Sequence, residues 1–375
     1  MNEPWHHPED LEGSVRYINT LTDAVRSTGC AKLVFYNVSQ DFRIGEAIRR
    51  SKAQGVTFGW YPTGLNAGHE LEGNHLRAVD TFPDMLRPEL GRLPRIVYEF
   101  DSPDLRTGTM YPAMARTFRA VGAQFAAMFA YDMLKTASRN LGWQTHYLNL
   151  VYTPRKAMSA VIAAEVMHRL PRLRSYGRYP ENTHFGDFRV SYDGDWSALT
   201  AFDAFLYAGS TRATPPDPAA LRRIAGYGSS SIVTYDGEGI YFLDKVRPGV
   251  WRLEVYPDAV PVGDPFEPPS ADKIVTRAIS RAWAMTGTAG HQRGSGGRAV
   301  RAWAVHGYAR RLRVERLRIR RQHHAARADR QCRFHGIPSA SRRHPSPFSA
   351  VTHRARIPRR ARRRARCSRR GIHPS

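Results

Sequence analysis

The chain has 375 residues, of which 42% are hydrophobic, so it is long enough for one large domain or two ordinary ones with a buried core. Its formal net charge of +24 is unevenly distributed, because residues 291–375 hold 25 Arg, no Lys and two acids, whereas residues 1–290 hold 32 basic and 31 acidic side chains. The three cysteines form no CxxC pair, no basic patch followed by an apolar run opens the chain, and no 18-residue stretch is apolar throughout, so the sequence indicates no disulfide framework, zinc site, signal peptide or membrane span.

Strands and helices alternate over the first 171 residues. Short apolar runs predict strands at 33–39, 55–64, 95–101 and 123–132. Helical spacing of apolar residues predicts helices at 42–52, 109–122 and 153–171, the last with Thr153 as its cap and Pro154 at its first position. This alternation is typical of α/β folds, in which helical crossovers connect the strands of a parallel sheet.

The pattern changes after residue 171. Residues 172–230 are rich in Tyr, Gly, Pro and Asp, which indicates a connecting segment with one short helix at 217–228. From Ser231 to Pro261, short alternating runs are separated by Asp-Gly and Pro-Gly, which are turn residues of β-hairpins. We therefore expect part of a small antiparallel β module over 231–286.

Acidic and aromatic residues stand where the predicted strands end. Trp60 and Tyr61 end one strand, Glu99 ends the next, and Tyr131 ends the last. In a parallel α/β barrel the active site forms at the C-terminal ends of the strands, so we expect these side chains on one rim. Aromatic side chains at such a rim could stack on sugar rings.

A second glutamate stands near the start of the chain, in Asn2-Glu3-Pro4-Trp5. If Glu3 also ends a strand, that strand comes three before the strand of Glu99, and in a closed eight-stranded barrel the two carboxylates would face each other across the mouth. Glycoside hydrolysis needs such a pair, because one carboxyl group protonates the leaving oxygen and the other attacks the anomeric carbon or activates water. Glu3 could instead be an ordinary acid in a first helical turn.

Asn2-Glu3-Pro4 resembles the Asn-Glu-Pro signature of the clan A retaining glycoside hydrolases, which are (β/α)8 barrels. Three further stretches look like a group of bacterial barrel glycosidases with a C-terminal β module: WYPTGLNAGHELEGN (60–74), YEFDSPDLRTGTMYPAMARTFRAVGAQFAAMFAYD (98–132) and QTHYLNLVYTP (144–154). The resemblance covers residues 1–285. It implies a carbohydrate substrate, with no cofactor and no metal.

The resemblance also implies a role for each matching residue. Glu3 would be the acid/base that ends the fourth strand of the clan, and Asn2 would contact the sugar 2-hydroxyl. Glu99 would be the nucleophile that ends the seventh strand, with Tyr61 as a hydrogen-bond partner.

The resemblance places the chain in the second half of a barrel. Residues 1–171 would hold the end of strand four through helix eight, so the fold class is α/β, with the C-terminal half of a (β/α)8 (TIM) barrel followed by the β module.

The clan carries an aromatic residue, often Trp, at the end of the eighth strand, where this chain has Phe129 and Tyr131. Trp5 is a further candidate sugar contact. We expect the chain to be a fragment without measurable hydrolysis of aryl glycosides.

Structural roles compete with these functional ones. Glu99 could be the partner of Arg95 or Arg119, although an unpaired charge on a buried strand is costly. Trp60 and Tyr61 could be core aromatics.

Residues 287–375 form an Arg-rich tail that we expect to be disordered. Runs such as RRARRRARCSRR (359–370) bind phosphates, which favours a nucleic-acid-binding arm. An out-of-frame readthrough of a GC-rich gene accounts better for the absence of Lys and for the abrupt change after 281–286. The sequence therefore leaves two alternatives to a hydrolase: a nucleic-acid-binding protein with an Arg arm, and a carbohydrate-binding protein without turnover.

Overall fold

The computed structural model describes residues 9–38, 41–91, 93–133, 148–259, 266, 282–287, 301–308 and 311–316. The chain divides into two compact units, Met1–Arg320 and Arg321–Ser375, and every described residue belongs to the first. Asn2, Glu3 and Trp5 lie outside the described residues, so the predictions for them stay predictions.

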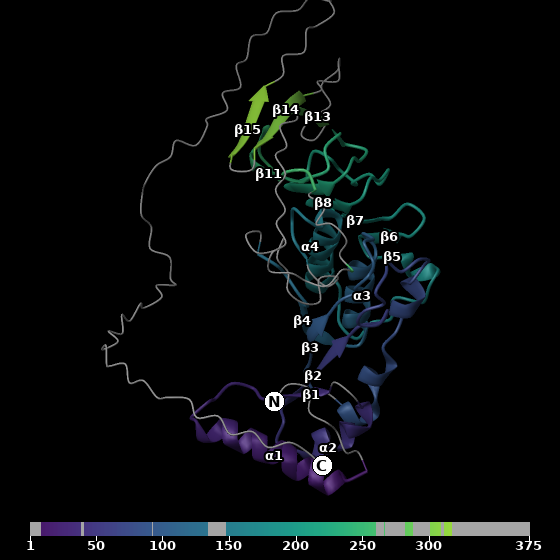
Figure 1. Cartoon of the computed structure of the whole chain (residues 1–375), viewed down its shortest axis with the longest axis vertical. Helices are drawn as coiled ribbons and strands as arrows, with labels where there is room; N and C mark the ends of the chain where they lie inside the picture. Colours follow the sequence, from purple (N-terminus) through teal and green to yellow (C-terminus); the bar gives the residue numbers. More distant parts are fainter. Residues whose placement is uncertain are drawn as a thin grey trace, which may run out of the picture. The chain divides into compact units, whose positions relative to one another are not determined.

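The first sheet consists of four strands, all parallel and in chain order (Figure 1). They are β1 (Phe35–Val38), β2 (Gly55–Trp60), β3 (Arg95–Phe100) and β4 (Ala123–Met128). Each strand falls within a predicted one, and the predicted parallel α/β arrangement is confirmed. Within the described residues the sheet is open, with β1 and β4 as its outer strands.

Helices precede, connect and follow these strands. They are α1 (Leu11–Ser27), α2 (Gly45–Arg50), α3 (Met110–Ala120) and α4 (Pro154–Arg169). The predicted helices at 42–52, 109–122 and 153–171 are confirmed, with Pro154 in the first turn of α4. Short 3-10 helices lie at η1 (Phe42–Ile44), η2 (Leu76–Val79), η3 (Pro83–Leu86), η4 (Pro88–Leu90) and η7 (Glu181–Thr183).

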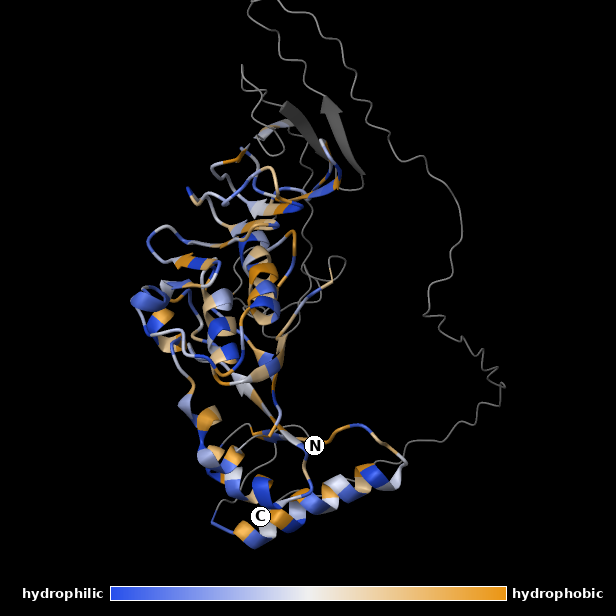
Figure 2. Ribbon diagram, turned by 180° about the vertical axis from the view of Figure 1, so that it is seen from behind, coloured by the Kyte–Doolittle hydropathy of each residue, from blue (hydrophilic) through white to orange (hydrophobic). Residues whose placement is uncertain are grey.

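One face of the first sheet packs against helices to form the core. Val38, Phe58 and Val97 are buried there, and the Phe58 ring lies 6.4 Å from that of Phe118 on α3, between centroids. The helices show hydrophobic and hydrophilic segments side by side in Figure 2, the pattern expected of helices that bury one face. None of the helices in the described part of the chain is long and apolar enough to cross a membrane.

The second sheet has seven strands in the order β12-β11-β9-β8-β7-β6-β5. They are β5 (His184–Phe185), β6 (Phe188–Ser191), β7 (Trp196–Thr200), β8 (Ala204–Ala208), β9 (Arg223–Tyr227), β11 (Ile240–Arg247) and β12 (Val250–Val255). All neighbours are antiparallel except β8 and β9, which are parallel. α4 contacts α3 and also β7, β8 and β9, so this one helix packs between α3 and the second sheet.

This sheet corrects the predicted boundary between a connecting segment and a β module. The segment 172–230 holds five of the seven strands, and β9 replaces the helix predicted at 217–228. The central residues of β9 are buried because the strand pairs with β8 on one side and β11 on the other. Pairing on both edges outweighs the weak helical spacing of so short a run.

A third, antiparallel sheet has the order β10-β13-β14-β15. Its strands are β10 (Val233–Tyr235), β13 (Ala282–Gly287), β14 (Arg301–Tyr308) and β15 (Arg311–Arg316). Two of these strands, β14 and β15, lie within residues 287–375, for which we predicted an Arg-rich tail. The rest of 288–375 lies outside the described residues.

Candidate functional site

Glu99 lies at the C-terminal end of β3, where a bulge decides which face of the sheet its side chain occupies. Phe58 of β2 pairs with Val97, but the next residue, Gly59, pairs with Glu99, so Tyr98 is an extra residue in β3. Val97 is buried against the helices. Regular alternation would direct Glu99 to that same face, and a one-residue bulge reverses the direction.

The residue opposite Glu99 on β2 is a glycine, and its missing side chain leaves space for two others. A Cβ placed at Gly59 would lie 3.2 Å from Cγ of Glu99 and 3.3 Å from both Oε1 of Glu99 and the hydroxyl oxygen of Tyr98. The side chains of Tyr98 and Glu99 therefore lie together over Gly59, on the face opposite the helices. We call Gly59, Tyr61, Tyr98 and Glu99 the Glu99 site.

Two tyrosine hydroxyls donate hydrogen bonds to the carboxylate of Glu99. The hydroxyl of Tyr98 lies 3.0 Å from Oε1. Tyr61, the residue directly after β2, also makes a side-chain hydrogen bond to Glu99, so the predicted contact is present. Burial, and then the negative charges of Glu99 and Asp101, raise the pKa of Tyr61 well above its ordinary value, so its hydroxyl stays protonated and remains a donor.

The cations considered as structural partners of Glu99 are directed elsewhere. The guanidinium group of Arg95 donates to the carbonyls of Met85 at 2.9 Å and Gly91 at 2.8 Å. That of Arg119 donates to the carbonyls of Leu170 at 2.7 Å and Ala123 at 2.9 Å. Both arginines bind the backbone around the sheet.

A buried ion pair lies just after the C-terminal end of β3. Asp101, two residues after Glu99, is fully buried, and its Oδ1 lies 3.1 Å from Nζ of Lys156 in the first turn of α4. The same oxygen accepts hydrogen bonds from the hydroxyl of Tyr111, at 2.5 Å, and from the amide of Ser102, at 2.7 Å. This network connects the end of β3 to the first turns of α3 and α4.

Trp60 and Tyr131 do not join the Glu99 site. Trp60 shares the helix-facing side of β2 with Phe58, is 8% exposed, and stacks on Phe82 with ring centroids 5.1 Å apart. The structure thus places Trp60 in the core, where it is not available to a sugar. Tyr131 is 55% exposed beyond the end of β4 and forms an isolated parallel bridge with Leu148.

Sequence reasoning identified Glu99 and Tyr61 but missed Gly59 and Tyr98. Strand alternation places Tyr98 on the opposite face from Glu99, so only knowledge of the bulge would unite them. A glycine in an otherwise apolar strand is a signal that could have been used, because it often marks a bulge or a close approach.

Asp132 is a further polar residue at this end of the sheet. Its Oδ2 is buried and has no hydrogen-bond partner among the described residues, and burial raises the pKa of its carboxyl group. It follows Tyr131 directly, and its carbonyl accepts a hydrogen bond from the side-chain amide of Asn149 at 2.8 Å.

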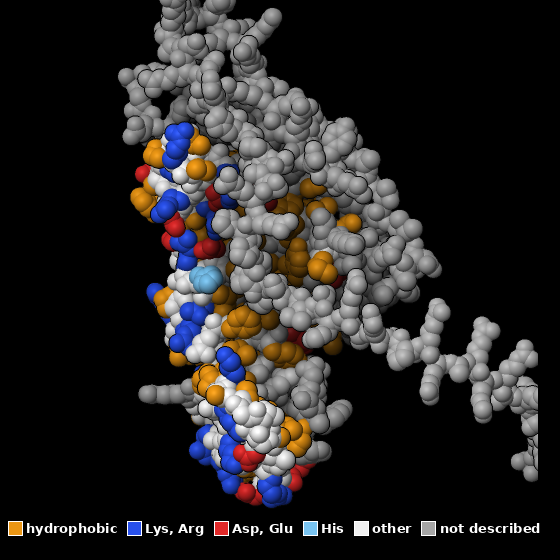
Figure 3. Space-filling view, turned by 90° about the vertical axis from the view of Figure 1, so that its left-hand side faces the viewer, with side chains coloured by type: hydrophobic (Ala, Val, Ile, Leu, Met, Phe, Trp, Pro, Cys, Tyr) orange, Lys and Arg blue, Asp and Glu red, His pale blue; other side chains and the backbone are white. Residues whose placement is uncertain are grey.

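Charged side chains on the described surface are mixed in sign. In the view of Figure 3, Lys and Arg side chains (blue) are interspersed with Asp and Glu (red). Near α1 and α2, for example, Arg50 lies 2.7 Å from Glu12 and Lys52 lies 2.6 Å from Asp23. Such pairing agrees with the nearly neutral composition of residues 1–290.

No three His, Cys, Asp or Glu side chains among the described residues lie close enough together to hold a metal ion. Comparisons of the chain with protein-family models, with curated proteins and with solved structures found no match. A functional assignment must therefore come from the geometry around Glu99 and from the motifs in the sequence.

Proposed function

We propose that this chain derives from a glycoside hydrolase that cleaves a carbohydrate glycosidic bond with retention, and that Glu99 is its nucleophile. One observation carries the proposal. A glutamate stands at the C-terminal end of a parallel strand, and a bulge turns it away from the helices into the reach of two tyrosine donors. Active sites of parallel α/β folds form at this end of the strands.

The hydrogen bonds suit a nucleophilic carboxylate. Donation by Tyr61 and Tyr98 favours the ionised form of a carboxyl group, and only this form can attack. In the proposed step an oxygen of Glu99 forms a bond to the anomeric carbon while the bond to the leaving oxygen breaks, and a general acid protonates that oxygen. Water then releases the sugar from Glu99.

The general acid and the barrel remain parts of the proposal. Four consecutive parallel strands with helices between them are equivalent to half of an eight-stranded barrel, and the helix-free face would then line its interior. In that arrangement Glu3 would be the acid/base that faces Glu99. Asn2, Trp5 and Tyr131 would contact the sugar.

Covalent trapping tests the proposal on the chain itself. A 2-deoxy-2-fluoro glycoside with a dinitrophenolate leaving group needs little acid assistance, so labelling reports on the nucleophile even where the acid is poorly placed. We expect mass spectrometry to find one added sugar on the peptide that contains Glu99. Glu99→Gln should abolish the label, and Glu46→Gln, on the surface of α2, should leave it unchanged.

The sugar is unknown, so the reagent is offered as a panel of gluco, galacto, manno and xylo forms. Labelling of a different carboxylate in the folded protein would reject Glu99 as nucleophile. No label from any member of the panel, with the fold verified by circular dichroism, would reject the hydrolase.

A further inference from the structure

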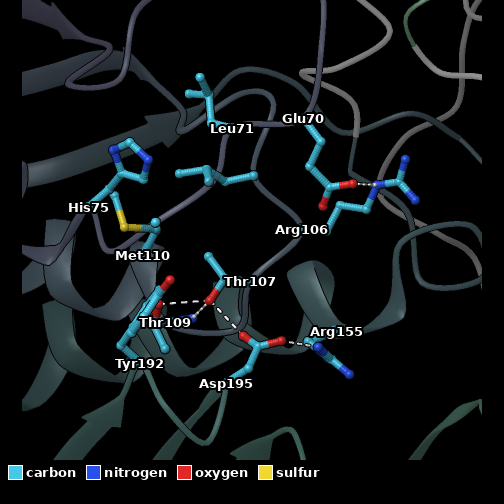
Figure 4. A pocket seen from close by; sticks show the side chains of 12 residues that line it. Glu70, Leu71, His75, Arg106, Thr107, Thr109, Met110, Arg155, Tyr192 and Asp195 are labelled. Carbon is cyan, nitrogen blue, oxygen red and sulfur yellow. Dashed lines mark hydrogen bonds and ion pairs between the residues drawn. The ribbon is translucent and has the colours of Figure 1, made fainter.

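A pocket of about 380 Å³ lies beside the loops that follow β2 and β3 (Figure 4). Residues from both loops line it, and so do residues of the first turns of α3 and α4 and of the turn between β6 and β7. Its volume is within the range of small-molecule sites in proteins, about 300–1,000 Å³. It thus joins the C-terminal edge of the first sheet to the second sheet.

The charges that line the pocket balance one another. Nε of Arg106 lies 3.4 Å from Oε2 of Glu70, and the two side chains are 65% and 48% exposed. Arg155 pairs with Asp195. Two acids and two arginines give no net attraction for an anion or a cation, but they offer acceptors and donors together. This combination fits hydroxyl groups, which both donate and accept.

The pocket also has apolar surface suited to the C–H face of a sugar ring. Leu105 and Met110 are buried in its wall, at 7% and 2% exposure. Tyr192, at the turn between β6 and β7, lines the pocket with 38% of its surface exposed. An amphipathic ring next to paired polar groups is suited to a ligand with apolar faces and polar edges.

Hydrogen bonds fix the wall that carries Tyr192. Asp195 accepts from the hydroxyl of Thr107 at 2.6 Å and from the amide of Gly108 at 2.9 Å. The turn between β6 and β7 is therefore attached to the loop after β3, as Figure 4 shows. A wall fixed in advance loses little entropy when a ligand binds.

We propose that this pocket binds one unit of a neutral oligosaccharide. The inference deepens the proposed function and rests on it for the expectation that the ligand is a sugar. The pocket would hold a unit of the chain other than the one attacked by Glu99, since it is built from different side chains of the neighbouring loops.

Calorimetric titration of the full chain with neutral hexasaccharides tests the inference. The probes are the hexaoses of cellulose, xylan, mannan and laminarin, with trigalacturonate and inorganic phosphate as anionic comparisons. We expect one neutral hexaose to bind, and Tyr192→Ala to weaken it about tenfold through loss of one aromatic contact. Arg106→Ala should weaken it as well. Phe202→Ala is the matched control, because Phe202 is a 66% exposed aromatic that does not line the pocket.

The outcomes separate the pocket from the nucleophile. Binding that depends on Tyr192 and survives Glu99→Gln supports the pocket, even if the fluorosugars label nothing and the hydrolase proposal fails. Equal weakening by Phe202→Ala, preference for trigalacturonate or phosphate, or no binding of any neutral hexaose would overturn the inference, whatever the result of the labelling.

Discussion

Gly59 is the residue on which the Glu99 site most depends for space. The Cβ of an alanine would stand 3.2–3.3 Å from Glu99 and Tyr98, closer than ordinary van der Waals contact. We expect Gly59→Ala to displace Glu99 and slow fluorosugar labelling about 10- to 100-fold, because small misplacements of reacting groups are costly. Gly45→Ala is the control, since its Cβ would meet no atom closer than 3.4 Å. Equal labelling of the two variants would show that the space over Gly59 is not needed.

Asp132 should oppose folding at neutral pH. Burial raises the pKa of its carboxyl group in the folded chain, so the unfolded chain releases this proton at lower pH than the folded chain does. The resulting loss of folding free energy develops as pH rises through the pKa of the carboxyl group in the unfolded chain, about 3.9. Well below that pH the loss is absent. We expect Asp132→Asn to raise the thermal midpoint at neutral pH and to change it less near pH 3. The control is Asp193→Asn, on an exposed turn, which should leave the thermal midpoint unchanged at neutral pH and near pH 3. A lower thermal midpoint of Asp132→Asn at neutral pH would contradict the argument.

At the scale of elements, the buried ion pair of Lys156 and Asp101 connects α4 to the end of β3, and the hydrogen bond from Tyr111 to Asp101 adds α3. Removing one partner of a buried pair leaves the other charge without compensation, which costs about 3–5 kcal/mol. We expect Lys156→Met to lower the free energy of unfolding in urea by that order, and Asp101→Asn in the same chain to restore part of the loss. The exposed pair of Lys52 and Asp23 gives the control, since Lys52→Met should cost at most about 1 kcal/mol. Similar losses in the two variants would mean that burial does not govern this pair.

The parallel sheet was predictable because each of its strands is a compact apolar run bounded by turn or helix signals. α1 was missed, although Leu11, Val15 and Ile18 recur at helical spacing behind Asp10, which caps the helix through the amide of Gly13 at 2.8 Å. β9 was read as a helix because five residues are too few to separate the two periods, and its pairing partners lie elsewhere in the chain.

Only half of the candidate site could be predicted from the sequence, because β3 contains a bulge. Composition and strand position identified Glu99 and Tyr61, but strict alternation would have buried Glu99 beside Phe118. The bulge at Tyr98 cannot be read from the hydrophobic pattern of β3, because it depends on how Gly59 of the neighbouring strand pairs.

At the scale of the molecule, charge is concentrated in the second compact unit. Residues 321–375 hold 16 Arg and one Asp, whereas residues 1–290 are nearly neutral. We expect the full chain to bind DNA or RNA without sequence preference, with an affinity that falls steeply as salt rises, because phosphate contacts release counterions. A chain that ends at Arg320 should lose most of this binding in a filter assay. Sequence-selective binding that survives high salt would favour a dedicated nucleic-acid function.

The position of α4 has a consequence for synthesis on the ribosome. This helix packs against α3 on the side of the first sheet and against β7, β8 and β9 of the second, and Arg169 near its end pairs with Asp203 at 3.0 Å. When residue 169 leaves the exit tunnel, the strands that cover its second side have not yet emerged. A nascent chain arrested before β8 would therefore expose apolar helix surface, which chaperones recognise, and α4 would reach its final environment only after residues 204–208 and 223–227 emerge. The two sheets should accordingly fold as one cooperative block rather than as successive domains.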